Sequence, residues 1–117
     1  MTSADITPLD GSGKKVSPQA YVYVIAAEGE AVKIGVAKNI QRRLNALQIG
    51  HPRRLSVAHE FMCVDRVEAY AVESRSHRLL KQHHMSGEWF GVSPEAAKAA
   101  ADKAFTNLKE EHLQEKE

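Results

Sequence analysis

Four side chains, far apart along the chain, carry the groups that hydrolysis of a phosphodiester requires: the phenol of Tyr23, the ammonium of Lys33, the guanidinium of Arg43 and the carboxylate of Glu73. This reaction needs a group that accepts a proton from water, cations that neutralise the charge developing on the phosphate, and often a divalent ion. Mg²⁺ tolerates a single protein carboxylate because it keeps waters and phosphate oxygens in its octahedral shell. These residues meet the requirements only if folding brings them together.

Two apolar, β-branched segments, residues 21–26 and 32–36, must position the first two groups, and Glu28-Gly29-Glu30 between them is a turn signal. They predict a β-hairpin. A three-residue loop places Ile25 opposite Lys33 and Tyr23 opposite Gly35. One face then carries the aromatic residues, the lysine and a glycine (Tyr21, Tyr23, Lys33, Gly35), and the other carries β-branched residues (Val22, Val24, Ile34, Val36). A loop of even length would bury Lys33 beside Val24, so the apolar pattern favours three residues.

Arg43 lies on a predicted helix that runs from about residue 40 to residue 49. Asn39 is a plausible N-cap, and Gly50 marks the C-terminal end. The apolar stripe of this helix is Ile40, Leu44 and Leu47. Arg43 borders that stripe, whereas Arg42 points about 100° further round, toward solvent.

Glu73 lies on a second predicted helix, which starts with a capping box at Asp65 and Glu68 and runs to about His84. A third strand precedes it, because Leu55, Val57 and Phe61 alternate with polar residues. The helix has an apolar face, which is Ala69, Val72, Ser76, Leu79 and Leu80. A second stripe lies along the edge of that face: Tyr70, Glu73, His77 and His84.

The remaining features indicate one α+β domain with a small three-stranded antiparallel sheet flanked by helices. Residues 1–18 read as a disordered leader and residues 19–92 as the domain. Residues 88–90 read as a short strand or packed turn. Residues 93–117 form a helix, with Ser93 as its cap, that packs on the domain or extends from it. No apolar run is long enough to cross a membrane, so we expect a cytoplasmic protein; the sequence leaves a homodimer open.

The net charge of +1 conceals a basic half, since six basic residues and no acidic one occur between Lys33 and Arg54. This predicts one basic patch, with Lys38, Arg42, Arg53 and Arg54 as candidate phosphate contacts to duplex or branched DNA. An ordinary solvated surface is the competing interpretation. Cys63 is the only cysteine, and together with His77, His83 and His84 it lacks a recognised zinc-ligand spacing.

The motifs, taken in order, resemble the GIY-YIG nuclease superfamily, and more narrowly its phage-type DNA-binding branch, in which lysine commonly replaces the second tyrosine. The resemblance spans about residues 21–90. It rests on Tyr-Val-Tyr at 21–23, Lys-Ile-Gly at 33–35, Arg-Arg-Leu at 42–44, the Glu73–His77 pair and Gly-Glu-Trp-Phe at 87–90. Tyr21 stands where the first motif has glycine, and an asparagine carried by many catalytic members has no match here.

The resemblance implies a divalent-metal-dependent DNA endonuclease that uses Mg²⁺ or Mn²⁺. Tyr23 matches the tyrosine that takes a proton from the attacking water, and Tyr21 and His77 join it as catalytic candidates. Lys33 would lower the pKa of Tyr23 through its charge, since a free phenol with a pKa of about 10 is a weak base. Arg43 matches the arginine that stabilises phosphate charge, and Glu73 the metal ligand.

Three functions remain open from sequence. The first is this endonuclease. The second is a catalytically inactive DNA-binding module that uses the same basic face, and the third is an interaction domain whose basic face meets a protein or RNA. Glu88 also remains open as a helix cap, a surface charge or a second metal ligand.

Overall fold

The computed structural model describes residues 20–28 and 31–115 of the chain. The predicted disordered leader, residues 1–18, lies outside the described residues. So do two of the three residues expected in the hairpin loop.

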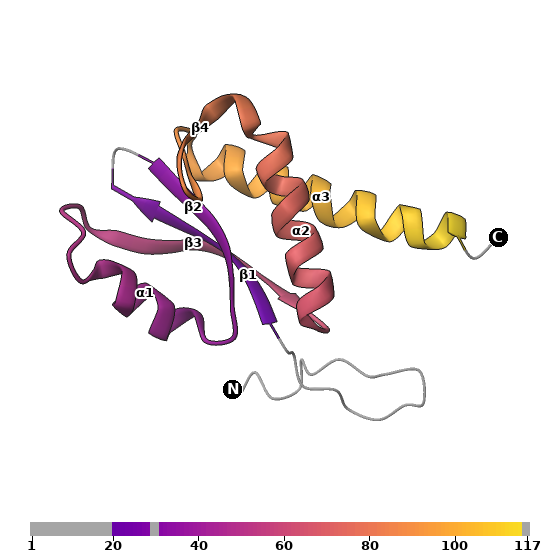
Figure 1. The fold of residues 1–117 in the computed structure, drawn as a ribbon, viewed down its shortest axis with the longest axis horizontal. Helices are drawn as coiled ribbons and strands as arrows, with labels where there is room; N and C mark the ends of the chain where they lie inside the picture. Colours follow the sequence, from indigo (N-terminus) through magenta and orange to yellow (C-terminus); the bar gives the residue numbers. More distant parts are fainter. Residues whose placement is uncertain (1–19, 29–30, 116–117) are drawn as a thin grey trace.

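The described residues form a sheet of five antiparallel strands: β1 (Ala20–Ala27), β2 (Ala31–Ala37), β3 (Leu55–Cys63), β4 (His84–Ser86) and β5 (Trp89–Phe90). Their order is β3-β1-β2-β5-β4 (Figure 1). The expected three-stranded sheet is therefore wrong, although the α+β class is right. The two added strands are very short. They form because Gly87, at φ +56°, turns the chain so that β5 pairs with Val32 and Lys33 of β2.

The register of the central hairpin is the predicted one, with Tyr23 opposite Gly35 and Ile25 opposite Lys33. Because side chains alternate between the two faces along each strand, Val22, Val24 and Ile34 lie on one face of the sheet, where all three are fully buried. The side chain of Tyr23 lies on the opposite face. The apolar pattern alone was enough to fix this register, because a slip of one residue would have reversed both faces.

A β-bulge in β3 changes the expected facing of that strand. Ile25 pairs with Val57, but its neighbour Val24 pairs with His59, so Ala58 is the extra residue. As a result Val57 packs on the same face as Tyr23, whereas Phe61 packs on the opposite face. Sequence alternation had placed Val57 and Phe61 on the same face, which is wrong.

Three α-helices accompany the sheet: α1 (Ile40–Gln48), α2 (Arg66–Leu79) and α3 (Pro94–Glu115). Each of the three predicted N-caps accepts a hydrogen bond from a backbone N–H three residues later, at 2.8–3.1 Å. The accepting side-chain oxygens belong to Asn39 at α1, Asp65 at α2 and Ser93 at α3. The expected capping box is formed in part, because Glu68 accepts the N–H of Val64 instead of that of Asp65. None of these helices has both the length and the apolar stretch needed to cross a membrane.

The second helix ends earlier than expected, at Leu79, and a 3₁₀ turn (η2, Lys81–His83) follows it. Leu79 is 44% exposed instead of belonging to the apolar face. His84 starts β4, so it does not continue the polar stripe of the helix. The shortening allows β4 to fold back beside β5.

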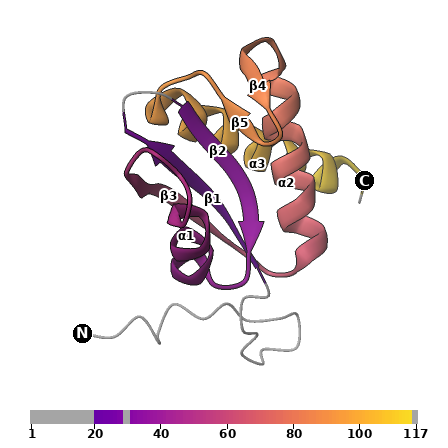
Figure 2. The same cartoon turned by 60° about the vertical axis from the view of Figure 1, so that its left-hand side comes forward.

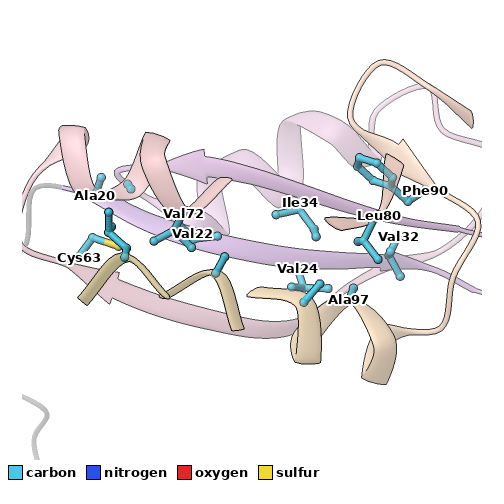
Figure 3. Packing of buried hydrophobic residues seen from close by; sticks show 14 residues of the cluster. Ala20, Val22, Val24, Val32, Ile34, Cys63, Val72, Leu80, Phe90 and Ala97 are labelled. Carbon is cyan, nitrogen blue, oxygen red and sulfur yellow. The ribbon is translucent and has the colours of Figure 1, made fainter. Parts of the chain in front are cut away.

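The sheet is covered on both faces. Helices α2 and α3 lie on one face and α1 on the other (Figures 1 and 2). The larger core lies under α2 and α3 and joins Val22, Val24 and Ile34 to Val72 of α2 and Ala97 of α3 (Figure 3). The smaller core lies under α1 and includes Tyr23, Ile25, Ala27, Ile40 and Leu55. Tyr23 therefore lies on the α1 side of the sheet and Glu73 on a helix of the other side.

We predict that Phe90→Ala lowers the free energy of unfolding by about 3–5 kcal/mol, the usual cost of removing a buried phenyl ring. Phe90 is 1% exposed and its ring contacts those of His77 and His84. Urea denaturation measures the loss. Met85→Ala, in the neighbouring strand and 55% exposed, is the control and should change stability by about 0.5 kcal/mol or less. Equal stability of the two variants would show that β5 does not pack as described.

Candidate active site

The side-chain-free backbone of Gly35 is the point where groups from both faces of the sheet meet. The phenol of Tyr23 lies over it, and a Cβ at residue 35 would lie only 2.6 Å from Cζ of that ring. Oε1 of Glu88 would lie 3.1 Å from the same Cβ. A side chain at this position would therefore displace the phenol. Gly35 is required for space, since its backbone has no positive φ.

Tyr23 and Arg43 form the first pair in the site. The Tyr23 side chain is buried, and Nε of Arg43 donates a hydrogen bond to its hydroxyl at 3.4 Å. Burial raises the pKa of Tyr23, and the hydrogen bond and charge of Arg43 partly oppose this effect. The guanidinium itself lies at the exposed end of the contact, so the same group can also meet a ligand from solvent.

Lys33 and Glu88 form the second pair. Nζ of Lys33 lies 2.8 Å from Oε1 of Glu88 and 5.8 Å from the centre of the Trp89 ring. Lys33 was expected to lower the pKa of Tyr23, and this is wrong. The pKa of Tyr23 is raised, the cation at its hydroxyl is Arg43, and the ammonium of Lys33 is held by Glu88.

Glu73 joins the cluster from α2. Burial and the charge of Glu88 raise its pKa, while His77 and Lys33 lower it by a smaller amount. The charge of Glu88 is the second-largest cause of this shift, after burial. The two acidic groups are therefore direct neighbours, although fifteen positions separate them in the chain.

His77 fixes α2 against the sheet. Its Nε2 lies 2.8 Å from the backbone oxygen of Ile34, and its ring packs on Phe90. Because a carbonyl oxygen only accepts, Nε2 carries the proton in this contact. This nitrogen is occupied by the hydrogen bond to β2. In the free protein, His77 therefore holds α2 in place against the sheet.

Tyr21 is half-buried on the Tyr23 face and packs against the smaller core. Its hydroxyl forms no hydrogen bond with another side chain or with the backbone of the described part of the chain. The structure therefore brings Tyr23, Lys33, Arg43 and Glu73 together with Glu88, places His77 at their margin, and leaves Tyr21 apart from their polar contacts.

The carboxylates fit a hard divalent cation. No group of three His, Cys, Asp or Glu side chains is arranged as a metal site among residues 20–28 and 31–115. Mg²⁺ is nevertheless commonly held by one or two carboxylates together with waters and substrate phosphates. Glu73 and Glu88 would supply such a pair, and a cation between them would relieve the repulsion that raises the pKa of Glu73.

The expected single basic patch is divided in the structure. Lys38, Arg42 and Arg43 line one hollow with Val36 and Ala46. Lys33 is buried in its pair with Glu88 and takes no part in this surface.

The other two candidate phosphate contacts, Arg53 and Arg54, belong to the loop after α1. The backbone oxygen of Arg54 accepts the N–H of Glu28, at the hairpin-turn end of the sheet. Ala37, which precedes Lys38, pairs with Tyr21 near the opposite end of the hairpin. Six residue steps of strand, or about 20 Å, separate the two ends. The two basic groups therefore belong to segments at opposite ends of the central hairpin.

Sequence reasoning did not assign Glu88 to the site, although it left a metal-ligand role open. The sequence feature that could have indicated Glu88 is its position in Gly-Glu-Trp-Phe, directly before the two aromatic residues of β5. The contact with Lys33 depends on the pairing of β5 with β2, and nothing in the local sequence indicates that pairing.

Comparison with known proteins assigns the chain to a family. No curated protein and no solved structure gives a significant match to the chain. The T5orf172 domain, a phage-associated domain of the GIY-YIG-like, nuclease-related grouping, matches residues 20–105. The match covers most of the chain, includes every residue of the cluster around Gly35 and reaches into α3. The protein therefore belongs to the T5orf172 domain family.

Proposed function

We propose that this domain is a divalent-metal-dependent DNA endonuclease of the GIY-YIG type. The observation that carries the proposal is the convergence of a phenol, a guanidinium, an ammonium and two carboxyl groups around the backbone of Gly35. Family membership supports it, because the T5orf172 domain belongs to a nuclease-related grouping.

In this proposal, Tyr23 and Arg43 act on the attacking water and on the phosphate. The phenol is protonated in the free protein at neutral pH, because burial raises its pKa. Arg43 favours the phenolate that forms when Tyr23 takes a proton from water, and its exposed guanidinium can bind a phosphate oxygen at the same time. The pair would couple deprotonation of water to stabilisation of the charge on phosphorus.

Glu73 and Glu88 would hold Mg²⁺ or Mn²⁺, which supplies Lewis-acid stabilisation of the phosphate when bound. Lys33 positions Glu88 through their 2.8 Å contact. His77 positions Glu73, one helical turn earlier, by tying α2 to the carbonyl of Ile34.

A second candidate is a DNA-binding module that does not cut. The raised pKa of Tyr23 favours it, because a phenol that resists deprotonation is a poor base. Salt-dependent DNA binding that is unaffected by a chelator and is accompanied by no cleavage would support this second function.

We predict that the protein nicks supercoiled plasmid in Mg²⁺ or Mn²⁺, and that Arg43→Ala reduces kcat about 10²–10³-fold, as loss of a charge-stabilising donor does. Glu73→Gln should abolish metal-dependent nicking. Arg42→Ala is the matched control, because Arg42 lies next in the chain and makes no contact with Tyr23; it should change mainly KM. Nicking that persists equally in the Arg43 and Glu73 variants would come from a contaminant and would end the proposal.

We also predict that Gly35→Ala lowers activity at least 100-fold, since the new Cβ pushes the Tyr23 phenol out of place and displacements of about 1 Å have such effects. Gly91→Ala is the control. A Cβ there makes only ordinary contacts, the nearest 3.6 Å from Sδ of Met85. Plasmid nicking under single-turnover conditions compares the two. Full activity of Gly35→Ala would show that the phenol position does not matter.

Finally, if Tyr23 acts as the base, its raised pKa makes the phenolate scarce at neutral pH and more abundant as pH rises. The logarithm of the cleavage rate should therefore increase with pH with a slope of about one from neutrality to about pH 9. Tyr23→Phe should remove both the activity and this slope. A rate that falls over the same range would instead assign Tyr23 the role of proton donor.

A further inference from the structure

The second half of β2 forms an open edge beside the candidate site. Strand β5 pairs with Val32 and Lys33, and after them no described strand continues along this side of β2. In Figure 2 this part of β2 runs between α1 and α2 toward its C-terminal end. The open edge therefore leads from Gly35 to the hollow lined by Lys38, Arg42 and Arg43.

One row of side chains on α2 follows this edge. Arg66, Tyr70, Glu73 and His77 are spaced by four, three and four residues, so they share one helix face. Glu73 belongs to the cluster around Gly35 and His77 bonds to Ile34, so this face is the one directed toward β2. Arg66 and Tyr70 continue the row toward the N-terminus of α2. Both are exposed, Tyr70 by 53%.

The contact between His77 and Ile34 fixes where this row of α2 side chains lies along β2. Tyr70 lies seven residues before His77, which is about 10 Å of helix. Ala37 lies three residues after Ile34, which is also about 10 Å of strand. Because α2 begins near Ala20 and Cys63, which pair with each other at the same end of the sheet as Ala37, the two displacements have the same direction. Tyr70 is therefore alongside the end of β2.

Cations stand on both sides of this path. Lys38 and Arg42 lie on the α1 side and Arg66 on the α2 side, and all three are exposed. Within the described ranges none of these three side chains forms an ion pair. Unpaired cations on both sides of an exposed aromatic ring match a polyanion whose bases are free to stack.

We propose that an unpaired DNA strand binds along the open edge of β2, with a base stacked on Tyr70 and with Lys38, Arg42 and Arg66 at its phosphates. This inference rests on the proposed function and narrows its substrate to DNA with a single-stranded segment next to the cleaved bond. A fully paired duplex offers Tyr70 no exposed base face, whereas a single strand does.

Fluorescence anisotropy with labelled oligothymidylate and with a hairpin duplex, in EDTA so that no cleavage occurs, tests the inference. The wild-type protein should bind the single strand more tightly than the duplex. Tyr70→Ala should weaken single-strand binding about 5- to 100-fold, as loss of one base–aromatic stack does, and Tyr70→Phe should restore it. Arg66→Ala should reduce by about one the steepness with which log affinity falls with log salt. The control is Lys98→Ala, since Lys98 is an exposed lysine on α3, and it should change neither the single-strand affinity nor its salt dependence. Thermal melting should show that all variants remain folded.

The inference is overturned if Tyr70→Ala leaves the single-strand affinity unchanged or if the wild-type protein binds the duplex more tightly than the single strand. If an RNA of the same length binds more tightly than the oligothymidylate, the surface binds RNA instead. Because the measurement contains no metal, it is independent of cleavage. Binding as predicted without any nicking would contradict only the endonuclease, and nicking of paired DNA that is unaffected by Tyr70→Ala would contradict only the strand path.

Discussion

The close approach of the Tyr23 phenol to the backbone of Gly35 is the constraint on which the rest of the site depends. It lets a ring from β1 lie across the neighbouring strand, so that its hydroxyl reaches Arg43 on α1 while Glu88 approaches the same backbone from the turn before β5. Groups from opposite faces of a sheet are normally separated by the sheet itself. Here they meet because the edge of β2 carries no side chain at residue 35, and because β5 stops two residues earlier.

The charged groups of the cluster add little to the free energy of unfolding. A half-buried ion pair such as Lys33–Glu88 contributes little net free energy, since desolvation of the buried lysine opposes the attraction between the charges. Glu73 beside Glu88 is unfavourable in its ionised form, as its raised pKa shows. The apolar cores on both sides of the sheet must therefore supply the stability that holds these groups together.

Much of this arrangement follows from local sequence signals. The alternation of residues in β1 and β2 was enough to predict the hairpin register, and the capping residues Asn39, Asp65 and Ser93 marked where the helices begin. The strands β4 and β5 were beyond such reasoning, because two or three residues have no periodicity and their pairing depends on distant partners. The bulge at Ala58 was equally hidden, since it appears only when β3 is aligned with β1. Lys33 was placed correctly in register, but its partner was missed for the same reason: Glu88 reaches it only through the β2–β5 pairing.

That short pairing also determines when the site is complete during synthesis. Trp89 meets Lys33 across more than fifty intervening residues, and closing so long a loop is among the slower steps of folding for a small domain. The hairpin and α1 are adjacent in the chain, so Tyr23 and Arg43 are separated by far fewer residues than Lys33 and Glu88. The carboxyl pair of the cluster cannot form before residue 88 has left the ribosome, so the acidic groups are the last part of the site to be available during synthesis.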